Sequence, residues 1–516
     1  MAGDKLFLRA SGNYSKRDGF VRNEFNGEDL QNLEAIEGNF RLKYFASDRL
    51  TFSLLYSVQY RESDAFAQVL ASPENGITFQ DILRENPYSV SYNEDIVKRA
   101  KTSNVALNTT VDFGQVSLTS VTALQTTDRF RRDDFDFSPD PVQVFNTDID
   151  LFNFTQEFRL ASTRTAALSR TTAVFLFSTE ETDDGTQAAP QATTLEKNET
   201  TRSGLDVFGQ LSYALNSKLK VTAGLRLDYE NVEGEVDRST GDIDQQESFR
   251  EEADSTAISP KLALSSQLKP DIFLFANVAR GYRSGGVNTI VSNAEDALFD
   301  PEITWNYEAG IKTTLLKNRL KLNLTGFWIN YTDQQILNIL DISQFLAGTE
   351  NIGKSRSFGL EPETQALITQ GLSVNLNAGY LHTEILDYTV SRVDLATFQE
   401  VEIDESGNEL PVSPEFNGNV NLNYILPITP KLNLEASLDY TYQSEIFWDP
   451  SNINTQDAYG LLNARLGVTS KNIDVFFWSK NLIDEEYFVY GFGTNGFNAA
   501  TYGLPRTYGV ILTGKF

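Results

Sequence analysis

The chain ends in the sequence Pro505-Arg506-Thr507-Tyr508-Gly509-Val510-Ile511-Leu512-Thr513-Gly514-Lys515-Phe516. At a period of two residues, this segment separates an apolar face of Tyr508, Val510, Leu512 and Phe516 from a small or polar face of Thr507, Gly509, Thr513 and Lys515. Such alternation is typical of a β-strand whose two faces meet different environments, and only Ile511 departs from it. Because the ends of soluble domains more often fray into polar tails, an aromatic last residue indicates a final strand that is paired within a sheet.

The same alternation recurs along the chain. Apolar or small residues occupy every second position from Leu205 to Leu215, and after Asn216-Ser217 the pattern resumes from Leu219 to Tyr229. This arrangement predicts a hairpin with a tight turn and one continuous apolar face. Comparable strands are predicted at 372–380, 432–442 and 462–468. Strands this long, with polar faces this regular, differ from those of a soluble sandwich.

The connections between these strands alternate in length. Short turns such as Asn216-Ser217 and Lys317-Asn318 separate long polar or acidic segments, which we expect at 62–100, 130–150, 183–200, 233–250, 285–301, 335–352, 387–413 and 447–457. Short turns at one end and long loops at the other are the layout of an outer-membrane β-barrel, with the turns in the periplasm. The pattern predicts one all-β transmembrane domain over residues 1–516, with about twenty antiparallel strands. Tyrosines at strand ends, among them Tyr213 and Tyr380, fit an interfacial girdle.

Composition narrows the alternatives. A soluble antiparallel sheet, a β-solenoid or a propeller would also alternate, but none explains long strands, alternating loop lengths and a terminal Phe together. No run approaches the roughly 18 apolar residues that a membrane helix needs. With 43 Lys+Arg against 71 Asp+Glu and a net charge of −28, a nucleic-acid partner is disfavoured by repulsion. The absence of cysteine and a single histidine, His382, argue against a metal centre, a cofactor or an enzyme.

A family resemblance appears near the carboxy-terminus. The sequence Lys480-Asn481-Leu482-Ile483-Asp484-Glu485-Glu486-Tyr487, then Gly503-Leu504-Pro505-Arg506-Thr507-Tyr508-Gly509 and the final Phe516, resembles the signature of TonB-dependent outer-membrane receptors. Segments 155–160, 279–288 and 324–333 resemble the barrel of the same family. The resemblance runs from about residue 5 to the end of the chain.

The resemblance implies a localisation, a function and partners. In that family a globular plug fills a barrel of about 22 strands, and a short peptide ahead of the plug contacts the inner-membrane TonB energy transducer. It implies a monomeric outer-membrane receptor for energised uptake of a metal chelate, with a ferric siderophore as the first expectation. Cobalamin, haem and carbohydrates enter through the same fold. Lipid, lipopolysaccharide and the barrel-assembly machinery are the other expected partners, with Tyr508 and Phe516 as the assembly signal.

The chain also departs from the family pattern. Met1-Ala2-Gly3-Asp4-Lys5 leads directly into a strand, so we expect neither a signal peptide, nor a plug, nor the first barrel hairpin in this chain. A barrel one hairpin short has two unpaired edges, and contact with TonB would pass only through the missing plug region. A passive, porin-like channel and a non-functional receptor fragment therefore remain as alternatives.

The first candidate ligand surface lies between Arg280 and Asn288. Its glycines permit turns or close backbone approach. The side chains of Arg280, Tyr282, Arg283 and Asn288 could contact an anionic, oxygen-rich ligand such as a ferric chelate. The alternative is that this segment is only the structural end of a strand.

A second candidate surface is formed by Phe130 and Phe135, which lie among arginines in a predicted loop. Aromatic residues in a long loop more often pack the loop onto itself, so a structural role remains the alternative. Arg226 and Asp228 share one face of a strand and are expected to form a structural ion pair across neighbouring strands. Acidic runs such as Asp183-Asp184 could hold divalent cations, but they are expected to be solvated loops. His382 is expected to be a girdle or loop residue and not a metal ligand.

Overall fold

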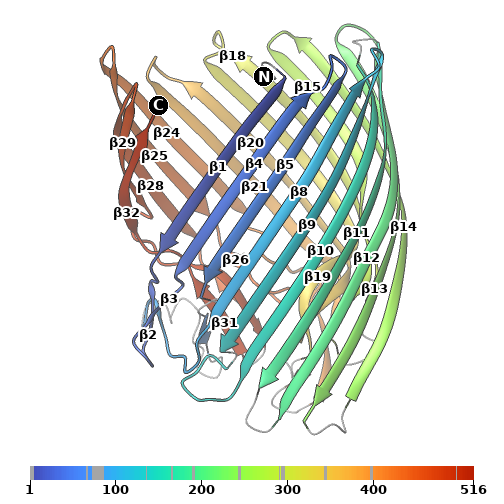
Figure 1. Ribbon diagram of the computed structural model, residues 1–516, viewed down its shortest axis with the longest axis vertical. Helices are drawn as coiled ribbons and strands as arrows, with labels where there is room; N and C mark the ends of the chain where they lie inside the picture. Colours follow the sequence, from blue (N-terminus) through green and yellow to red (C-terminus); the bar gives the residue numbers. More distant parts are fainter. Residues whose placement is uncertain are drawn as a thin grey trace.

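The alternating sequence folds into one antiparallel sheet of 20 strands that curves round into a barrel (Figure 1). The computed structural model describes residues 5–515, apart from 65–67, 72–85, 135, 164–166, 189–191, 242–245, 290, 292–293, 295–296, 342–345, 395–398 and 495–496. The barrel strands are β1 (Leu6–Arg17), β4 (Leu33–Phe45), β5 (Leu50–Ser63), β8 (Val97–Asp112), β9 (Val116–Asp134), β10 (Val144–Ser162), β11 (Leu168–Ala188), β12 (Thr193–Ala214), β13 (Leu219–Thr240), β14 (Gln246–Lys269), β15 (Ile272–Arg283), β18 (Glu302–Leu315), β19 (Leu320–Asp341), β20 (Leu346–Leu367), β21 (Leu372–Asp387), β24 (Phe416–Thr429), β25 (Leu432–Gln443), β28 (Tyr459–Ser470), β29 (Ile473–Lys480) and β32 (Thr507–Gly514). The prediction of about twenty antiparallel strands is confirmed.

The two ends of the barrel differ as the sequence predicts. Tight turns, such as those at 215–218 and 316–319, lie at the end that also carries both chain termini, and long connections lie at the opposite end (Figure 1). The amide oxygen of Asn216 accepts hydrogen bonds from the backbone N–H groups of Lys218 and Leu219, at 2.8 and 2.9 Å, which closes one such turn. We call these ends the turn end and the loop end.

The two faces of the sheet also differ. Leu211, Leu225 and Leu227 are exposed on the outer face, whereas Asp206 and Asp228 are buried on the face toward the lumen. An apolar outer face is what acyl chains require. On the outer face, Trp328 stacks on Phe358 at 5.0 Å between ring centroids, and His382 lies 4.9 Å from the same ring. These rings form an aromatic row across β19, β20 and β21.

Several barrel strands extend further than the sequence predicts. Loops were expected at 183–200 and 233–250, but β11 continues to Ala188, β12 begins at Thr193, β13 continues to Thr240 and β14 begins at Gln246. The expectation was wrong because strand hydrogen bonding continues where both faces meet water, and the apolar alternation that reveals a strand then disappears. At the loop end, the strands of the barrel wall therefore extend beyond the membrane and surround the opening of the barrel, which we call the outer mouth.

The sheet has two unpaired edges. β1 pairs with β4 and β32 pairs with β29, and within the described residues neither strand has a partner on its other side. The exposure of Tyr508 (82%), Val510 and Leu512 on β32 confirms the predicted apolar face. Phe516 lies outside the described residues. The predicted open edges are thus present, and we call the space between β1 and β32 the seam.

Loops at the loop end form a small core of their own on both sides of the seam. The outer-loop core consists of Val21, Leu30, Val90, Tyr92, Ile96, Phe488, Ala500 and Tyr502. Short strands support it: β2 (Val21–Asn23) pairs with β3 (Asp29–Leu30) and β7 (Ser89–Val90), and β31 (Phe497–Tyr502) pairs with β30 (Phe488–Thr494) and β6 (Gln68–Ala71). Since β2 follows β1 and β31 precedes β32, this core joins the loops that adjoin both edges.

The remaining short strands lie in other long connections at the loop end. They are β16 (Gly286–Val287), β17 (Leu298–Phe299), β22 (Thr389–Asp394), β23 (Gln399–Asp404), β26 (Ile446–Phe447) and β27 (Thr455–Gln456). One of these connections packs against the loop-end parts of β20 and β21. The contact is a second loop core, formed by Ile352, Ile385, Tyr388, Val390 and Leu410. The long connections are thus folded elements that surround the outer mouth.

Candidate functional site

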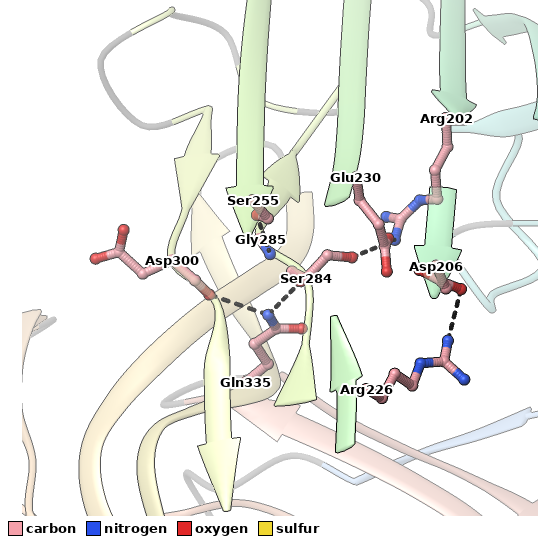
Figure 2. Close-up of polar contacts among 9 residues, drawn as sticks. All are labelled: Arg202, Asp206, Arg226, Glu230, Ser255, Ser284, Gly285, Asp300 and Gln335. Carbon is pink, nitrogen blue, oxygen red and sulfur yellow. Dashed lines mark hydrogen bonds and ion pairs between the residues drawn. The ribbon is translucent and has the colours of Figure 1, made fainter. Parts of the chain in front are cut away.

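The described residues of the connection between β15 and β18 (284–289, 291, 294 and 297–301) fold against the barrel wall at the loop end. Arg202 on β12 donates a hydrogen bond from Nη1 to Ser284 Oγ at 2.7 Å, and the same nitrogen lies 3.5 Å from Glu230 on β13 (Figure 2). Gln335 on β19 donates from Nε2 to the backbone carbonyls of Ser284 and Asp300, at 2.8 and 3.0 Å. The start and the end of this connection are therefore both tied to the barrel.

The same connection approaches the wall closely at Gly234 on β13. A Cβ at this position would lie 2.6 Å from Val287 Cγ1, so a larger residue would push the connection away from the strand. On the same face of β13, Val232 and Val236 are almost completely buried. Apolar contact therefore adds to the hydrogen bonds that hold 284–301.

Asn288 anchors the connection on its other side. Its Nδ2 donates to the carbonyl of Thr349 and its Oδ1 accepts from the N–H of Thr349, both at 2.8 Å. The side chain is buried, and its amide is engaged by backbone groups of β20. Asn288 thus positions the connection, and direct contact of its side chain with a ligand stays a prediction.

The structure separates the other candidates in the first predicted surface. Arg280 donates from Nη1 to the carbonyl of Ile258 at 2.6 Å, which ties β15 to β14. The hydroxyl of Tyr282 is buried. Arg283 is exposed, and within the described residues its guanidinium forms no ion pair. Of these side chains, Arg283 is the exposed one, and it lies at the point where β15 meets the anchored connection.

The second predicted surface has a different character from the one expected. Phe130 belongs to strand β9 and not to a loop, and the guanidinium of Arg99 lies 5.4 Å from its ring centroid. Phe130 shares its face with the outward-facing Leu124, because six residues separate them along the strand. It therefore lies on the outside of the barrel wall. Phe135 lies outside the described residues, and a ligand role for either ring stays a prediction.

The predicted ion pair at Arg226 is present and larger than expected. Arg226 Nη2 lies 2.6 Å from Asp206 on β12 (Figure 2). Its Nε also pairs with Asp228 on its own strand, β13. Both carboxylates are almost fully buried, and the guanidinium lies 5.7 Å from the ring centroid of Phe208. One arginine therefore holds two carboxylates on the lumen side of neighbouring strands, below the anchored connection.

The residues that sequence analysis missed are Arg202, Ser255 and Gln335. Ser255 Oγ accepts a hydrogen bond from the N–H of Gly285 at 3.3 Å, which adds β14 to the strands that anchor the connection. Each of these side chains looks like an ordinary polar position on an inward strand face. Their role depends on a connection that folds back onto strands distant in sequence, and alternation carries no signal of that contact.

Asp134 introduces a titratable group among the outer loops. It ends β9 beyond the membrane-spanning part, its side chain is buried, and its Oδ2 accepts a hydrogen bond from the N–H of Glu94 at 3.2 Å. Burial, and then repulsion from Asp136, raise the pKa of Asp134 to about 6. Because this pKa exceeds the usual value of about 3.9, the folded loop binds a proton more tightly than the unfolded loop. The resulting stability is full below about pH 4 and is lost as the pH rises through about 6.

We therefore expect the segment around Glu94 to be better protected from amide exchange at about pH 5 than at about pH 7.5. Asp134→Asn should remove most of this pH dependence and raise protection at the higher pH. The matched control is Asp148→Asn, an exposed aspartate on the neighbouring strand β10. Equal pH dependence of the protection factors in wild type and Asp134→Asn would contradict the assignment.

The described residues contain no cluster of three or more His, Cys, Asp or Glu side chains able to hold a metal ion. In the part of the chain that the structure describes, no helix is long and apolar enough to cross a membrane.

The architecture defines a class of protein. An antiparallel barrel with an apolar outer face, tight turns at one end and long connections at the other is a transmembrane β-barrel of the bacterial outer membrane. Residues 6–482 match the family model described as TonB dependent receptor-like, beta-barrel. The chain belongs to this family, whose members lie in the outer membrane of Gram-negative bacteria.

Solved receptors share the fold over nearly the whole chain. The ferric yersiniabactin uptake receptor FyuA from Yersinia pestis superposes with a TM-score of 0.84 at 19% identity, covering 99% of this chain and 75% of that receptor. The siderophore receptor PiuA from Acinetobacter baumannii gives a TM-score of 0.76 at 14% identity, covering 99% and 77% of the two chains. At these identities the likeness shows the fold alone.

Sequence likeness to curated relatives is more local. The metal-pseudopaline receptor CntO of Pseudomonas aeruginosa is 28% identical over 130 residues, which cover 25% of this chain and 17% of CntO. PiuA of Acinetobacter baumannii, described as a probable TonB-dependent siderophore receptor, is 26% identical over 214 residues, covering 41% and 27% of the two chains. The chain thus aligns with less than a third of the length of either curated relative.

Proposed function

We propose that this chain forms the barrel of an outer-membrane receptor for energised uptake of a metal chelate, with a ferric siderophore as the ligand. Membership of the TonB-dependent receptor family supports the uptake class. The names of FyuA, PiuA and CntO, which are receptors for siderophores or for a metal chelate, support the ligand class. The single structural observation that carries the proposal is the connection 284–301, whose described residues are anchored to the barrel wall at the loop end, with the exposed guanidinium of Arg283 beside it.

Chelate recognition at this position follows from simple chemistry. Ferric siderophore complexes present oxygen atoms and often a negative charge, and a guanidinium offers several donors to such a surface. Arg202, Ser255 and Gln335 fix the backbone beside Arg283, so less conformational freedom is lost on binding. In this proposal those three residues position the site, and Arg283 contacts the ligand.

The seam and the lumen belong to the same proposal. Two further strands would close the space between β1 and β32, and a plug in the lumen would provide the contact with TonB, whichever polypeptide supplies them. The unpaired edges support this, because exposed N–H and C=O groups in lipid are costly to leave unsatisfied. The same edges favour the second candidate function, a passive channel or an inactive receptor fragment, if the seam and the lumen remain unfilled.

Binding and conduction measurements distinguish these functions. We would present the purified chain in bilayers with a ferric catecholate, a ferric hydroxamate and a ferric carboxylate chelate, and measure both proteolytic protection of 284–301 and ion conductance. The receptor proposal expects saturable protection by one of these chelates. An open conductance that no chelate alters, without protection, would favour the passive channel.

Arg283→Ala tests the ligand role of the site directly. Loss of a hydrogen bond to a charged partner costs about 1.5–3 kcal/mol, so chelate affinity should fall by roughly tenfold or more while the barrel remains folded. Arg49→Ala, at a tight turn on the opposite end, is the matched control and should bind as wild type. If Arg283→Ala and wild type bind the chelate with equal affinity, Arg283 does not contact the ligand.

A further inference from the structure

The outer wall of the barrel carries a groove that the uptake function does not use. It crosses β9 to β13 near the turn end, has a volume of about 460 Å³, and is lined by Leu160, Arg170, Gly209, Leu211, Ala223 and Leu225 among others. This volume lies in the range of small-molecule sites, roughly 300–1,000 Å³. We call it the turn-end groove.

Strand register places most of its lining, including all of the residues named above, on one face of the sheet. Arg170 is paired with Leu211, and Leu211 with Ala223, while Gly209 is paired with Leu225. Leu160, Leu211 and Leu225 are exposed on the lipid side of the wall. Paired positions in a sheet point to the same side, so the groove opens toward the membrane and not toward the lumen.

The depth of the groove comes from small residues between large ones. Gly209 and Ala223 form a low floor between leucine side chains. The glycine is not required by crowding, because a Cβ at position 209 would meet nothing closer than 3.6 Å. A larger side chain would therefore fill the groove without displacing the strand.

A positively charged side chain, that of Arg170, lies at the edge of the groove nearest the turn end. Arg170 is close to the start of β11, is exposed, and within the described residues forms no ion pair. An arginine on the lipid-facing side of a barrel is costly at the bilayer midplane but is tolerated near an interface, where phosphate groups lie. A guanidinium can bind a phosphate through two parallel hydrogen bonds.

We propose that the turn-end groove is a binding site for a glycerophospholipid of the periplasmic leaflet, with its phosphate on Arg170 and one acyl chain along the floor formed by Gly209 and Ala223. The positive charge of Arg170 matches the phosphate of a lipid headgroup, and the apolar floor of the groove matches a hydrocarbon chain. Lipopolysaccharide belongs to the opposite leaflet, at the loop end. Such a site would hold a lipid at the wall formed by β9 to β13.

The experiment uses the full chain in dodecyl maltoside micelles, a detergent that carries no phosphate, with a small fraction of spin-labelled phosphatidylglycerol or spin-labelled diacylglycerol. Arg170→Gln should reduce the phosphatidylglycerol signal at the groove by about fivefold or more, with little effect on diacylglycerol, which lacks the phosphate. Gly209→Leu should reduce both, because it fills the floor. Inorganic phosphate should not displace the lipid. This result would show that the groove binds the phosphate of a lipid headgroup and not a free phosphate ion.

Two controls separate the groove from general effects on the wall. Arg99→Gln removes an outward arginine at the loop end, and Ala276→Leu enlarges an outward small residue on β15. Both should retain the wild-type lipid signal. Unchanged phosphatidylglycerol binding in Arg170→Gln, or equal losses in the control variants, would overturn the proposal. Because Gly209→Leu is independent of the arginine, misfolding of one variant would leave the other as a test.

Discussion

Replacing Tyr502 with alanine is expected to disrupt the outer-loop core while the barrel strands remain folded. Tyr502 is 1% exposed, and its ring lies 5.0 Å from Tyr88 and 5.3 Å from Phe488. Its hydroxyl donates to the carbonyl of Asn86 at 2.9 Å. Truncation of a buried aromatic side chain costs about 3–5 kcal/mol, which is comparable to the whole stability of a small loop domain.

The loss should be local because the loop core has few contacts with the strand ladders. Hydrogen exchange in the segments 18–32 and 86–96 should rise by several hundredfold, whereas exchange in β11 to β14 should be unchanged. Tyr502→Phe keeps the ring and should cost only about 1 kcal/mol. Tyr508→Ala, at a highly exposed position of β32, is the matched control for loss of an aromatic ring. If both alanine variants exchange alike, the outer-loop core does not act as a folding unit.

The same variant reports on the seam. The outer-loop core joins the connection after β1 to the connection before β32, so it restrains the separation of the two unpaired edges at the loop end. Spin labels on β1 and β32 should give a broader and longer distance distribution in Tyr502→Ala than in wild type. An unchanged distribution would show that barrel curvature alone sets the width of the seam.

Burial also raises the pKa of Tyr502 to about 12, chiefly because the phenolate would lose hydration in the loop core. This shift depends on the packing of Phe488 and Tyr88 around the ring. A tyrosine signal that titrates near its ordinary value in wild type would therefore argue against a formed loop core.

The barrel strands were predictable because lipid and water impose different residues on their two faces. The hairpin from Leu205 to Tyr229 forms with the predicted faces, and the Asn216 turn closes it. The same reasoning fails above the membrane. Around Asp183 and Lys197 both faces of the wall meet water, so polar residues occupy every position and the strands resemble loops in sequence.

Long-range packing of loops was not predictable from the sequence. Tyr502 and Asn86 are 416 residues apart in the chain, and no local pattern links them. The anchor at 284–301 shows the same limit, since Arg202 and Gln335 were ordinary inward polar positions until the connection folded onto them. By contrast, Arg226 and Asp228 were identified because two residues on one face of one strand are neighbours by geometry.

Loss of the Arg226 charge from the ion-pair cluster on the lumen side is expected to lower the stability of the barrel substantially. Arg226 lies between Asp206, which is 1% exposed, and Asp228, which is almost as buried. Arg226→Gln would leave two neighbouring carboxylates without their cation in a poorly hydrated position. Removal of one partner from a buried ion pair costs about 3–5 kcal/mol, and because the guanidinium is 45% exposed we expect about 2–3 kcal/mol.

A rescue experiment separates this electrostatic cost from lost packing. Adding Asp206→Asn to Arg226→Gln removes one of the two charges and should restore at least half of the lost free energy of unfolding, measured by denaturant titration in detergent micelles. The control is Arg465→Gln, a lumen-side arginine that lies 4.2 Å from the ring centroid of Phe476 and has no ion pair within the described residues. Its loss should cost about 1 kcal/mol or less. Only the electrostatic explanation requires that removing a carboxylate should compensate for the loss of the guanidinium. If the double variant is no more stable than Arg226→Gln, Arg226 therefore stabilises the barrel by packing on Phe208 and not by its charge.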